Sequence, residues 1–121
     1  MSAAPASAAS YTMYCDTTGA SGASTINGWA VGATSLGVIL SVTDGSADGH
    51  HVRIRLLGKD RAGNLITYQW RMNYDGNGTT KTWTTTASYS AGFGDVGVQV
   101  ARFEGDTQLN ACTDWLRGSE G

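Results

Sequence analysis

Apolar and polar residues alternate with a period of two in the middle of the chain. The segments His51–Leu57 and Leu65–Met72 both follow this pattern, and Lys59–Asn64 links them with a glycine and an asparagine. Because successive side chains of a strand point to opposite faces, the two segments predict a β-hairpin with one buried face. The residues expected on that buried face are Val52, Ile54, Leu56, Ile66, Tyr68, Trp70 and Met72.

Shorter apolar runs, separated by Gly, Asn and Asp turn residues, predict the other strands. They are Tyr11–Cys15, Gly28–Ala33, Leu36–Thr43, Asp95–Phe103 and Gln108–Leu116, the last being a strand or a short helix, and the almost all-polar Thr79–Thr86 is a further predicted strand. Leu36–Thr43 is apolar on both faces, which is typical of a central strand, whereas the Gly/Ser/Thr-rich Thr17–Thr25 predicts a loop. Seven to eight strands without a long helical pattern predict an all-β fold, either a single antiparallel β-sandwich or a small barrel.

Composition and charge narrow the class of protein. The 121 residues fit one domain, and only 15% of them are charged. The net charge of −2 recruits neither nucleic acid nor an anionic membrane surface. No apolar stretch approaches the roughly 18 residues that span a bilayer, so we expect no membrane insertion.

The two ends of the chain indicate an exported protein. Residues 1–10 are rich in Ala and Ser and predict a flexible arm before a domain over residues 11–121. Such a segment is typical of the start of a mature secreted protein, although a linker or tag remnant has the same composition. Cys15 and Cys112 lie near opposite ends of the domain, and in an extracellular protein they are expected to form a disulfide. The alternative is two buried free thiols.

No motif of catalytic or metal-binding chemistry occurs in the sequence. His50 and His51 are adjacent, so on a strand they point to opposite faces and are poorly placed to share a metal. Asp44–Asp48 and Asp75–Gly78 lack the closing glutamate of a calcium loop and are ordinary turn sequences. No serine lies in a Gly-x-Ser-x-Gly frame. We therefore expect a protein that is not an enzyme and has no metal or cofactor.

The basic residues supply the first candidate binding surface. Five of the eight fall on the predicted hairpin: Arg53, Arg55, Lys59, Arg61 and Arg71. Strict alternation places Arg53, Arg55 and Arg71 together on its non-core face, with Lys59 and Arg61 at the tip. Arginine binds carboxylates and phosphates in bidentate fashion, so this face suits an acidic protein partner or a glycan. The alternative is a solvated sheet face that discourages aggregation.

Tryptophans supply the second candidate surface. Trp83 has only polar neighbours, and an aromatic ring on a polar strand can stack on a sugar or fill a pocket of a protein partner. The alternative places Trp83 in the core. Trp29 lies near a predicted loop and gives a weaker version of the same argument. Trp70 and Trp115 are interpreted as structural residues.

The C-terminal part of the chain resembles a known family. Tyr89, Val96-Gly97-Val98, Cys112, Trp115 and Gly118 follow one another as in small exported actinobacterial proteins of the spore-associated protein A type. The chain length, the Ala-rich start and the single long disulfide also resemble the small adaptor subunit of umbrella toxin particles. The resemblance implies a non-enzymatic β-sandwich that bridges larger secreted subunits, with the N-terminal arm as a docking element. It assigns no functional residue.

These observations together predict a secreted, non-catalytic binding module, with a secreted protein as partner in an extracellular complex. The first alternative is a carbohydrate-binding module, which requires an exposed Trp83 and, for a platform of two rings, Trp29 exposed and coplanar with it. The second is an inhibitor of a secreted hydrolase, which requires a rigid exposed loop such as Gly45–Gly49 or Ala87–Gly94.

Overall fold

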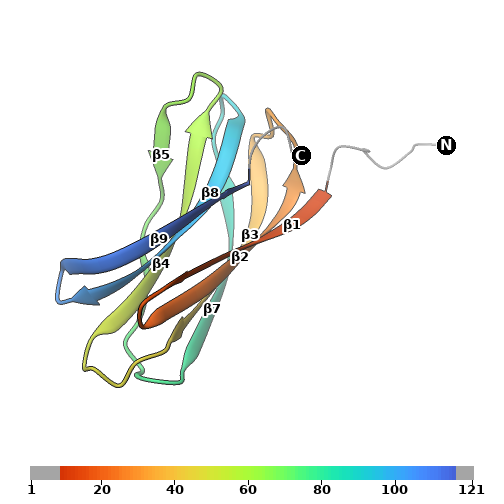
Figure 1. Ribbon diagram of the computed structural model, residues 1–121. Helices are drawn as coiled ribbons and strands as arrows, with labels where there is room; N and C mark the ends of the chain where they lie inside the picture. The colour runs from red at the N-terminus through yellow and green to blue at the C-terminus, as the bar shows by residue number, and fades with distance from the viewer. Residues whose placement is uncertain (1–8, 117–121) are drawn as a thin grey trace.

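The computed structural model describes residues 9–116, which fold into two antiparallel β-sheets without any helix (Figure 1). The four-stranded sheet has the order β1-β2-β3-β7, and the five-stranded sheet has the order β5-β4-β8-β9, with β6 also paired to β4. The all-β prediction is confirmed, and of its two architectures the sandwich is the one formed. The strands are β1 (Ala9–Thr17), β2 (Ala20–Trp29), β3 (Ser35–Asp44), β4 (His51–Asp60), β5 (Leu65–Thr67), β6 (Arg71–Asn73), β7 (Thr80–Ser88), β8 (Phe93–Glu104) and β9 (Thr107–Leu116).

The core lies between the two sheets and is built from alternate residues of the central strands. β3, β4 and β8 each place every second side chain inside, and the valines and leucines among them are almost completely buried. This is the pattern of a sandwich in which each sheet has one inner and one outer face. The largest fully buried side chains are Trp29, Phe93, Ile26, Leu36, Leu40, Ile54, Val38, Val42, Val52, Val96, Val98 and Val100.

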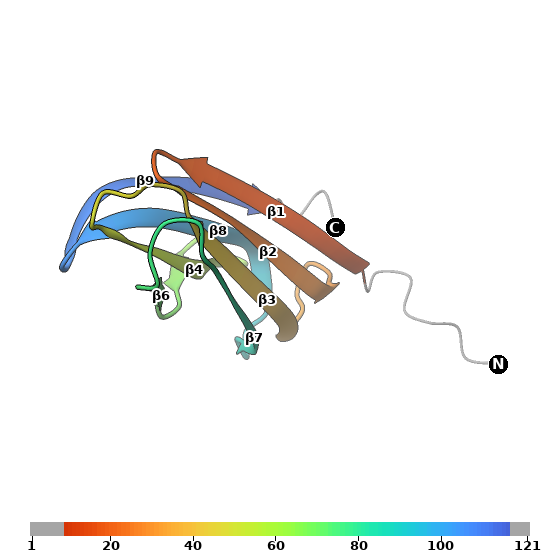
Figure 2. The same cartoon turned by 90° about the horizontal axis from the view of Figure 1, so that it is seen from below.

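One side of the sandwich is closed by edge strands that lie against each other. β1 and β9 run side by side there (Figure 2), and the predicted disulfide joins Cys15 to Cys112 with a Cα–Cα distance of 5.9 Å. The bond spans 97 residues of sequence, so it connects the first described strand to the last. It fixes the two sheets to each other along this side.

The opposite side is held together differently. β7 is the last strand of its sheet, and β5 and β6 form the edge of the other. Side-chain hydrogen bonds cross between them at two places: the Tyr68 hydroxyl donates to the Ser88 carbonyl at 3.1 Å, and Asn73 Nδ2 donates to the Thr79 carbonyl at 3.0 Å and to Thr79 Oγ1 at 3.2 Å. No β-ladder joins these edges, so the sandwich is open on this side.

The second strand differs from the one that the sequence predicts. Thr17–Thr25, expected as a loop, contains a short turn at Thr18-Gly19 and then the first half of β2. Conversely, Gly28–Ala33, expected as a strand, holds only the last two residues of β2 and the loop that follows. Serine, threonine and glycine form the strand here because its outer face carries hydroxyl groups, whereas its inner face buries Ala20, Ser24 and Ile26.

The hairpin exists, but its second arm is interrupted. Ile66 pairs with Gly58 and Arg71 with Ile54, so five residue steps on this arm span four on β4. An extra residue of this kind shifts the alternation by one and sends later side chains to the opposite face. The inward placement of Ile66 and Tyr68 is therefore confirmed. That of Trp70 and Met72 is wrong, because both follow the extra residue.

Two other findings concern the ends and the membrane. Ala9 and Ser10, expected in the N-terminal arm, belong to β1, while residues 1–8 and Gly118 lie outside the described residues. Within residues 9–116 there is no helix long and apolar enough to cross a membrane.

The closed side leads to a prediction about stability. Replacing both cysteines, in Cys15→Ala/Cys112→Ala, should lower the free energy of unfolding by roughly 4–5 kcal/mol, because a loop of 97 residues regains its entropy in the unfolded chain. Guanidinium unfolding of both proteins measures the difference. Dithiothreitol should destabilise the original protein similarly and leave the variant unchanged. Equal midpoints for the variant and the oxidised original protein would contradict this account.

Candidate functional site

The outer face of the five-stranded sheet brings aromatic and basic side chains together. We call it the aromatic–cation face. The odd-numbered residues of β4 point to this face, and so do the residues of β8 that pair with them and the residues of β9 that pair with those. The outward residues that follow the extra residue in the second arm of the hairpin also lie here. Its members are His51, Arg53, Arg55, Lys59, Leu65, Trp70, Met72, Tyr74, Phe103 and Trp115.

Three contacts between a cation and a ring organise this face. The Arg55 guanidinium lies 4.2 Å from the centre of the Trp70 ring, and the Lys59 ammonium lies 4.6 Å from that of Trp115. The Arg53 guanidinium lies 4.0 Å from the centre of Phe103. Each contact of this kind stabilises by about 0.5–1 kcal/mol when exposed and by more when desolvated. The cations and rings therefore hold each other in defined positions.

Arg53 is a buried organiser of the face rather than a solvated contact. Only 6% of it is exposed, and it donates hydrogen bonds to His51 Nε2 at 2.9 Å, to the Gly105 carbonyl at 2.9 Å and to Asp106 Oδ1 at 3.0 Å. These bonds use its donors within the protein. The prediction that Arg53 is available to a partner is therefore wrong, because neighbouring side chains cover the central strand even on its outer face.

Arg55 and Lys59 keep more of their surface in contact with solvent than Arg53 does, and Asp95 lies opposite Lys59 in the ladder. Both cations are half-buried, and Arg55 Nε donates to Gln99 Oε1 at 2.8 Å. Partial burial lowers the pKa of Arg55, yet a guanidinium stays protonated in neutral solution. Two positive charges thus stand beside indole rings on one surface.

An aromatic stack lies at the end of the face where β4 begins. The Tyr74 ring lies 4.2 Å from that of His51, and His51 in turn lies 5.8 Å from Phe103. Tyr74 is 64% exposed, so it presents one face of its ring to solvent. Burial, followed by the nearby charge of Arg53, lowers the pKa of His51. The neutral ring accepts from Arg53, which is consistent with this direction.

A glycine makes room for the indole at the other end. A Cβ atom at Gly97 would lie 2.7 Å from Cε3 of Trp115. Real Cβ atoms essentially never approach so closely, so only glycine lets the Trp115 ring lie directly on the sheet. The Lys59 ammonium then stands over the same ring.

Exposed apolar side chains gather on this face as well. Leu65 is 60% exposed and Met72 37%, and in the ladder both lie opposite outward residues of β4. With Tyr74 they make up three of the six large apolar residues that are exposed among residues 10–116. Exposed apolar groups beside fixed cations are typical of a surface that contacts another molecule.

The structure distributes the five basic residues of the predicted hairpin over three places, and Lys59, predicted at the tip with Arg61, lies in β4 instead. Arg53, Arg55 and Lys59 belong to the aromatic–cation face, whereas Arg61 lies at the exposed hairpin tip near Gly32. Arg71 is opposite Ile54 in the ladder and therefore points inward. The prediction that Arg71 shares a face with Arg53 and Arg55 is wrong, because the extra residue before β6 reverses its direction.

The two candidate tryptophans do not form a platform for sugars. Trp29 is completely buried, with 0% exposed, so its prediction as a contact residue is wrong. Trp83 lies opposite Leu40 in the ladder and packs against the core while remaining half-buried. Its polar neighbours Thr82 and Thr84 point outward instead.

The sequence analysis missed Trp70 and Trp115 as members of the face. For Trp115 the signal is present in the sequence: Gly97 is the one position of Val96–Val100 without a side chain, and it marks the place where a ring on the next strand can lie. For Trp70 no such signal exists, because an interruption of three residues between β5 and β6 cannot be read from composition.

The histidines have separate partners. His50 Nδ1 lies 2.5 Å from Glu104 Oε1, while His51 contacts Arg53 and Tyr74. Among residues 9–116 no group of three or more His, Cys, Asp or Glu is placed to hold a metal ion.

Comparison of the chain with protein-family models, curated proteins and solved structures found no significant match.

The environment of His51 leads to a prediction about pH. Its pKa is lower in the folded chain than its unfolded value of about 6.5, so folding disfavours its protonation. The stabilisation is complete above about pH 6.5 and is lost as the pH falls through the folded pKa. Unfolding free energies measured from pH 7.5 to pH 5 should therefore decline. The variant His51→Gln should decline less than the original protein, whereas His50→Gln should keep the decline. An unchanged slope in His51→Gln would contradict the assignment.

Proposed function

We propose that this chain is a secreted, non-catalytic binding module that docks a protein partner through the aromatic–cation face. The observation that carries the proposal is the joint presence of Trp70, Trp115 and Tyr74 with Arg55 and Lys59 on the outer face of one sheet. Tryptophan, tyrosine and arginine are the residues that most often dominate binding energy in protein interfaces.

The scaffold supports this role. Side chains held by cation–ring contacts on a strand lose little conformational freedom when a partner binds, which favours affinity. The disulfide fixes the two sheets to each other, and such bonds are typical of oxidising compartments outside the cytosol. Two positive charges on this face suit an acidic partner surface.

The cations that lie over the two indole rings favour a protein partner over a carbohydrate. Sugar binding by stacking needs a free, flat ring face. The two indoles each have a cation over the ring, at 4.2 Å for Trp70 and 4.6 Å for Trp115. Trp29, which would be the second ring of a sugar platform with Trp83, is completely buried.

The resemblance of the C-terminal segment extends the proposal. An adaptor subunit of an extracellular complex, such as a toxin particle, needs a small rigid domain that contacts larger subunits without catalysis. A sandwich of this size with one charged aromatic face fits that requirement. Residues 1–8 would supply the additional docking element that the resemblance implies.

The proposal is tested by affinity capture with paired variants. The tagged protein is incubated with culture supernatant of the organism that makes it, and captured proteins are quantified by mass spectrometry. In Arg55→Glu/Lys59→Glu we expect at least a tenfold loss of the captured partner, because the two half-buried cations of the face are reversed. The control Arg61→Glu/Lys81→Glu makes the same change of charge at exposed positions outside the face and should capture as much as the original protein.

Other outcomes would contradict the proposal. Equal capture by all three proteins would exclude the aromatic–cation face as the contact surface. Absence of any stoichiometric partner, together with retention on polysaccharide that is lost in Arg55→Glu/Lys59→Glu, would favour the carbohydrate alternative. Circular dichroism and melting temperatures of each variant show whether its fold is intact.

A further inference from the structure

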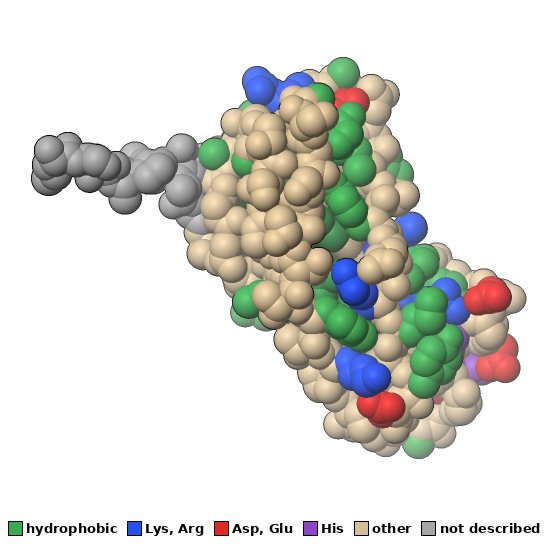
Figure 3. All heavy atoms as spheres, turned by 180° about the vertical axis from the view of Figure 1, so that it is seen from behind, with side chains coloured by type: hydrophobic (Ala, Val, Ile, Leu, Met, Phe, Trp, Pro, Cys, Tyr) green, Lys and Arg blue, Asp and Glu red, His purple; other side chains and the backbone are tan. Residues whose placement is uncertain are grey.

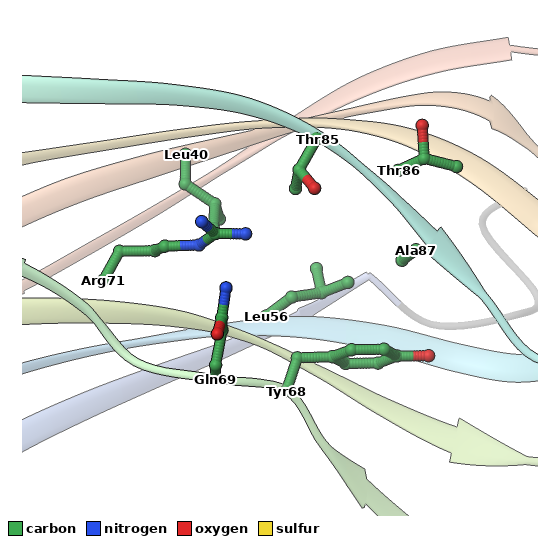
Figure 4. A pocket seen from close by; sticks show the side chains of 8 residues that line it. All are labelled: Leu40, Leu56, Tyr68, Gln69, Arg71, Thr85, Thr86 and Ala87. Carbon is green, nitrogen blue, oxygen red and sulfur yellow. The ribbon is translucent and has the colours of Figure 1, made fainter.

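A second surface lies on the open side of the sandwich, away from the disulfide. A cavity of about 250 Å³ lies between β7 and the segment that joins β5 to β6. Figure 3 shows one face of the molecule, on which hydrophobic and basic side chains form a band. A broad area without charged side chains lies next to this band. We call the cavity the Arg71 cleft. The residues that line it are Leu40, Leu56, Tyr68, Gln69, Arg71, Thr85, Thr86 and Ala87 (Figure 4).

The floor of the cleft is apolar, and one cation projects into it. Leu40, Leu56 and Ala87 are almost completely buried and belong to the core. The Arg71 guanidinium extends between Leu40 and Leu56 toward Thr85 (Figure 4). A guanidinium beside apolar groups is incompletely solvated, so an anion that reaches it is bound more strongly than at an open surface.

Arg71 has no acidic partner among the residues that the structure describes. None of the ion pairs within residues 9–116 includes it. When the Gln69 amide is turned so that its oxygen faces the guanidinium, that oxygen accepts from Nη1 and Nη2 at 3.1 Å each. A neutral amide satisfies donors without neutralising the charge, and a carboxylate would do both.

The cleft also borders an unpaired strand edge. β7 pairs with β3 on one side only. Its other side is bridged at the two ends, by Tyr68 to the Ser88 carbonyl and by Asn73 to the Thr79 carbonyl. The Tyr68 hydroxyl is the donor in its bridge, and burial raises its pKa further. Between these bridges the backbone of β7 offers hydrogen-bonding groups to an added strand.

We propose that the Arg71 cleft receives an extended acidic segment of another polypeptide. The segment adds a strand to the free edge of β7, places apolar side chains over Leu40 and Leu56, and directs one Asp or Glu carboxylate to Arg71. Main-chain pairing supplies affinity in such β-strand addition, and pockets for alternate side chains supply specificity. The carboxylate is the one group in the segment whose charge complements the cleft.

This site is separate from the aromatic–cation face. Arg71 points inward at the open side, whereas Arg55 and Lys59 point outward from β4. The inference goes beyond the proposed function by adding a peptide-binding edge to the module. An experiment that contradicts the peptide site at the Arg71 cleft therefore does not contradict the proposed function of the aromatic–cation face, and the reverse is also true.

Selection from random peptides tests the inference. Phage-displayed peptides of about twelve random residues are selected on the immobilised protein, and the enriched sequences are synthesised for calorimetry. We expect enriched peptides to carry Asp or Glu within an alternating apolar pattern. Their affinity should fall at least tenfold in Arg71→Met, which removes the charge but keeps an unbranched side chain. The control Arg61→Met loses the same charge at the exposed tip and should bind as the original protein does.

A second arm needs no protein variant. Replacing the acidic residue of the peptide by its amide should cause the same tenfold loss with the original protein, even if Arg71→Met folds poorly. Hydrogen exchange of β7 amides should slow when the peptide binds. The inference is overturned if no peptide is enriched, if enriched peptides lack an acidic residue or bind their amide forms equally well, or if binding is lost in Arg55→Glu/Lys59→Glu but not in Arg71→Met.

Discussion

Strand β4 contributes one face to the core and the other to the aromatic–cation face, and the rest of the structure depends on this alternation. Its even positions, Val52 to Leu56, pack between the sheets, while its odd positions carry the cations of the outer face. A shift of one residue in its pairing would bury charges and expose the core, so the register of β4 is strongly determined. The core and the aromatic–cation face are therefore two consequences of the same alternation.

The parts of the fold with strict alternation could be predicted from the sequence, and the parts that depend on pairing could not. β4, β3 and β8 are evident from their patterns, and the disulfide follows from the spacing of two cysteines. The first half of β2 buries small residues such as Ala20 and Ser24, so no apolar pattern predicts it as a strand. Arg71 was placed on the wrong face because one extra residue before β6 is invisible until Ile66 and Arg71 are paired with β4.

The candidate site shows the same limit. Alternation alone places Arg55 outside the core, but burial cannot be read from alternation. Arg53 is outward and yet only 6% exposed, because Phe103 and the residues around it cover the guanidinium. Trp115 required knowledge of the register between β8 and β9, which places it over Gly97.

The central claim is that the aromatic–cation face is where the module contacts its partner. Hydroxyl-radical footprinting, read by mass spectrometry, tests it most directly by comparing the free protein with the purified complex. We expect oxidation of Trp70, Met72 and Trp115 to fall several-fold in the complex. Tyr14, which is 70% exposed on the four-stranded sheet, should stay equally reactive. Protection of Tyr14 with unchanged oxidation of Trp70 and Trp115 would contradict the claim.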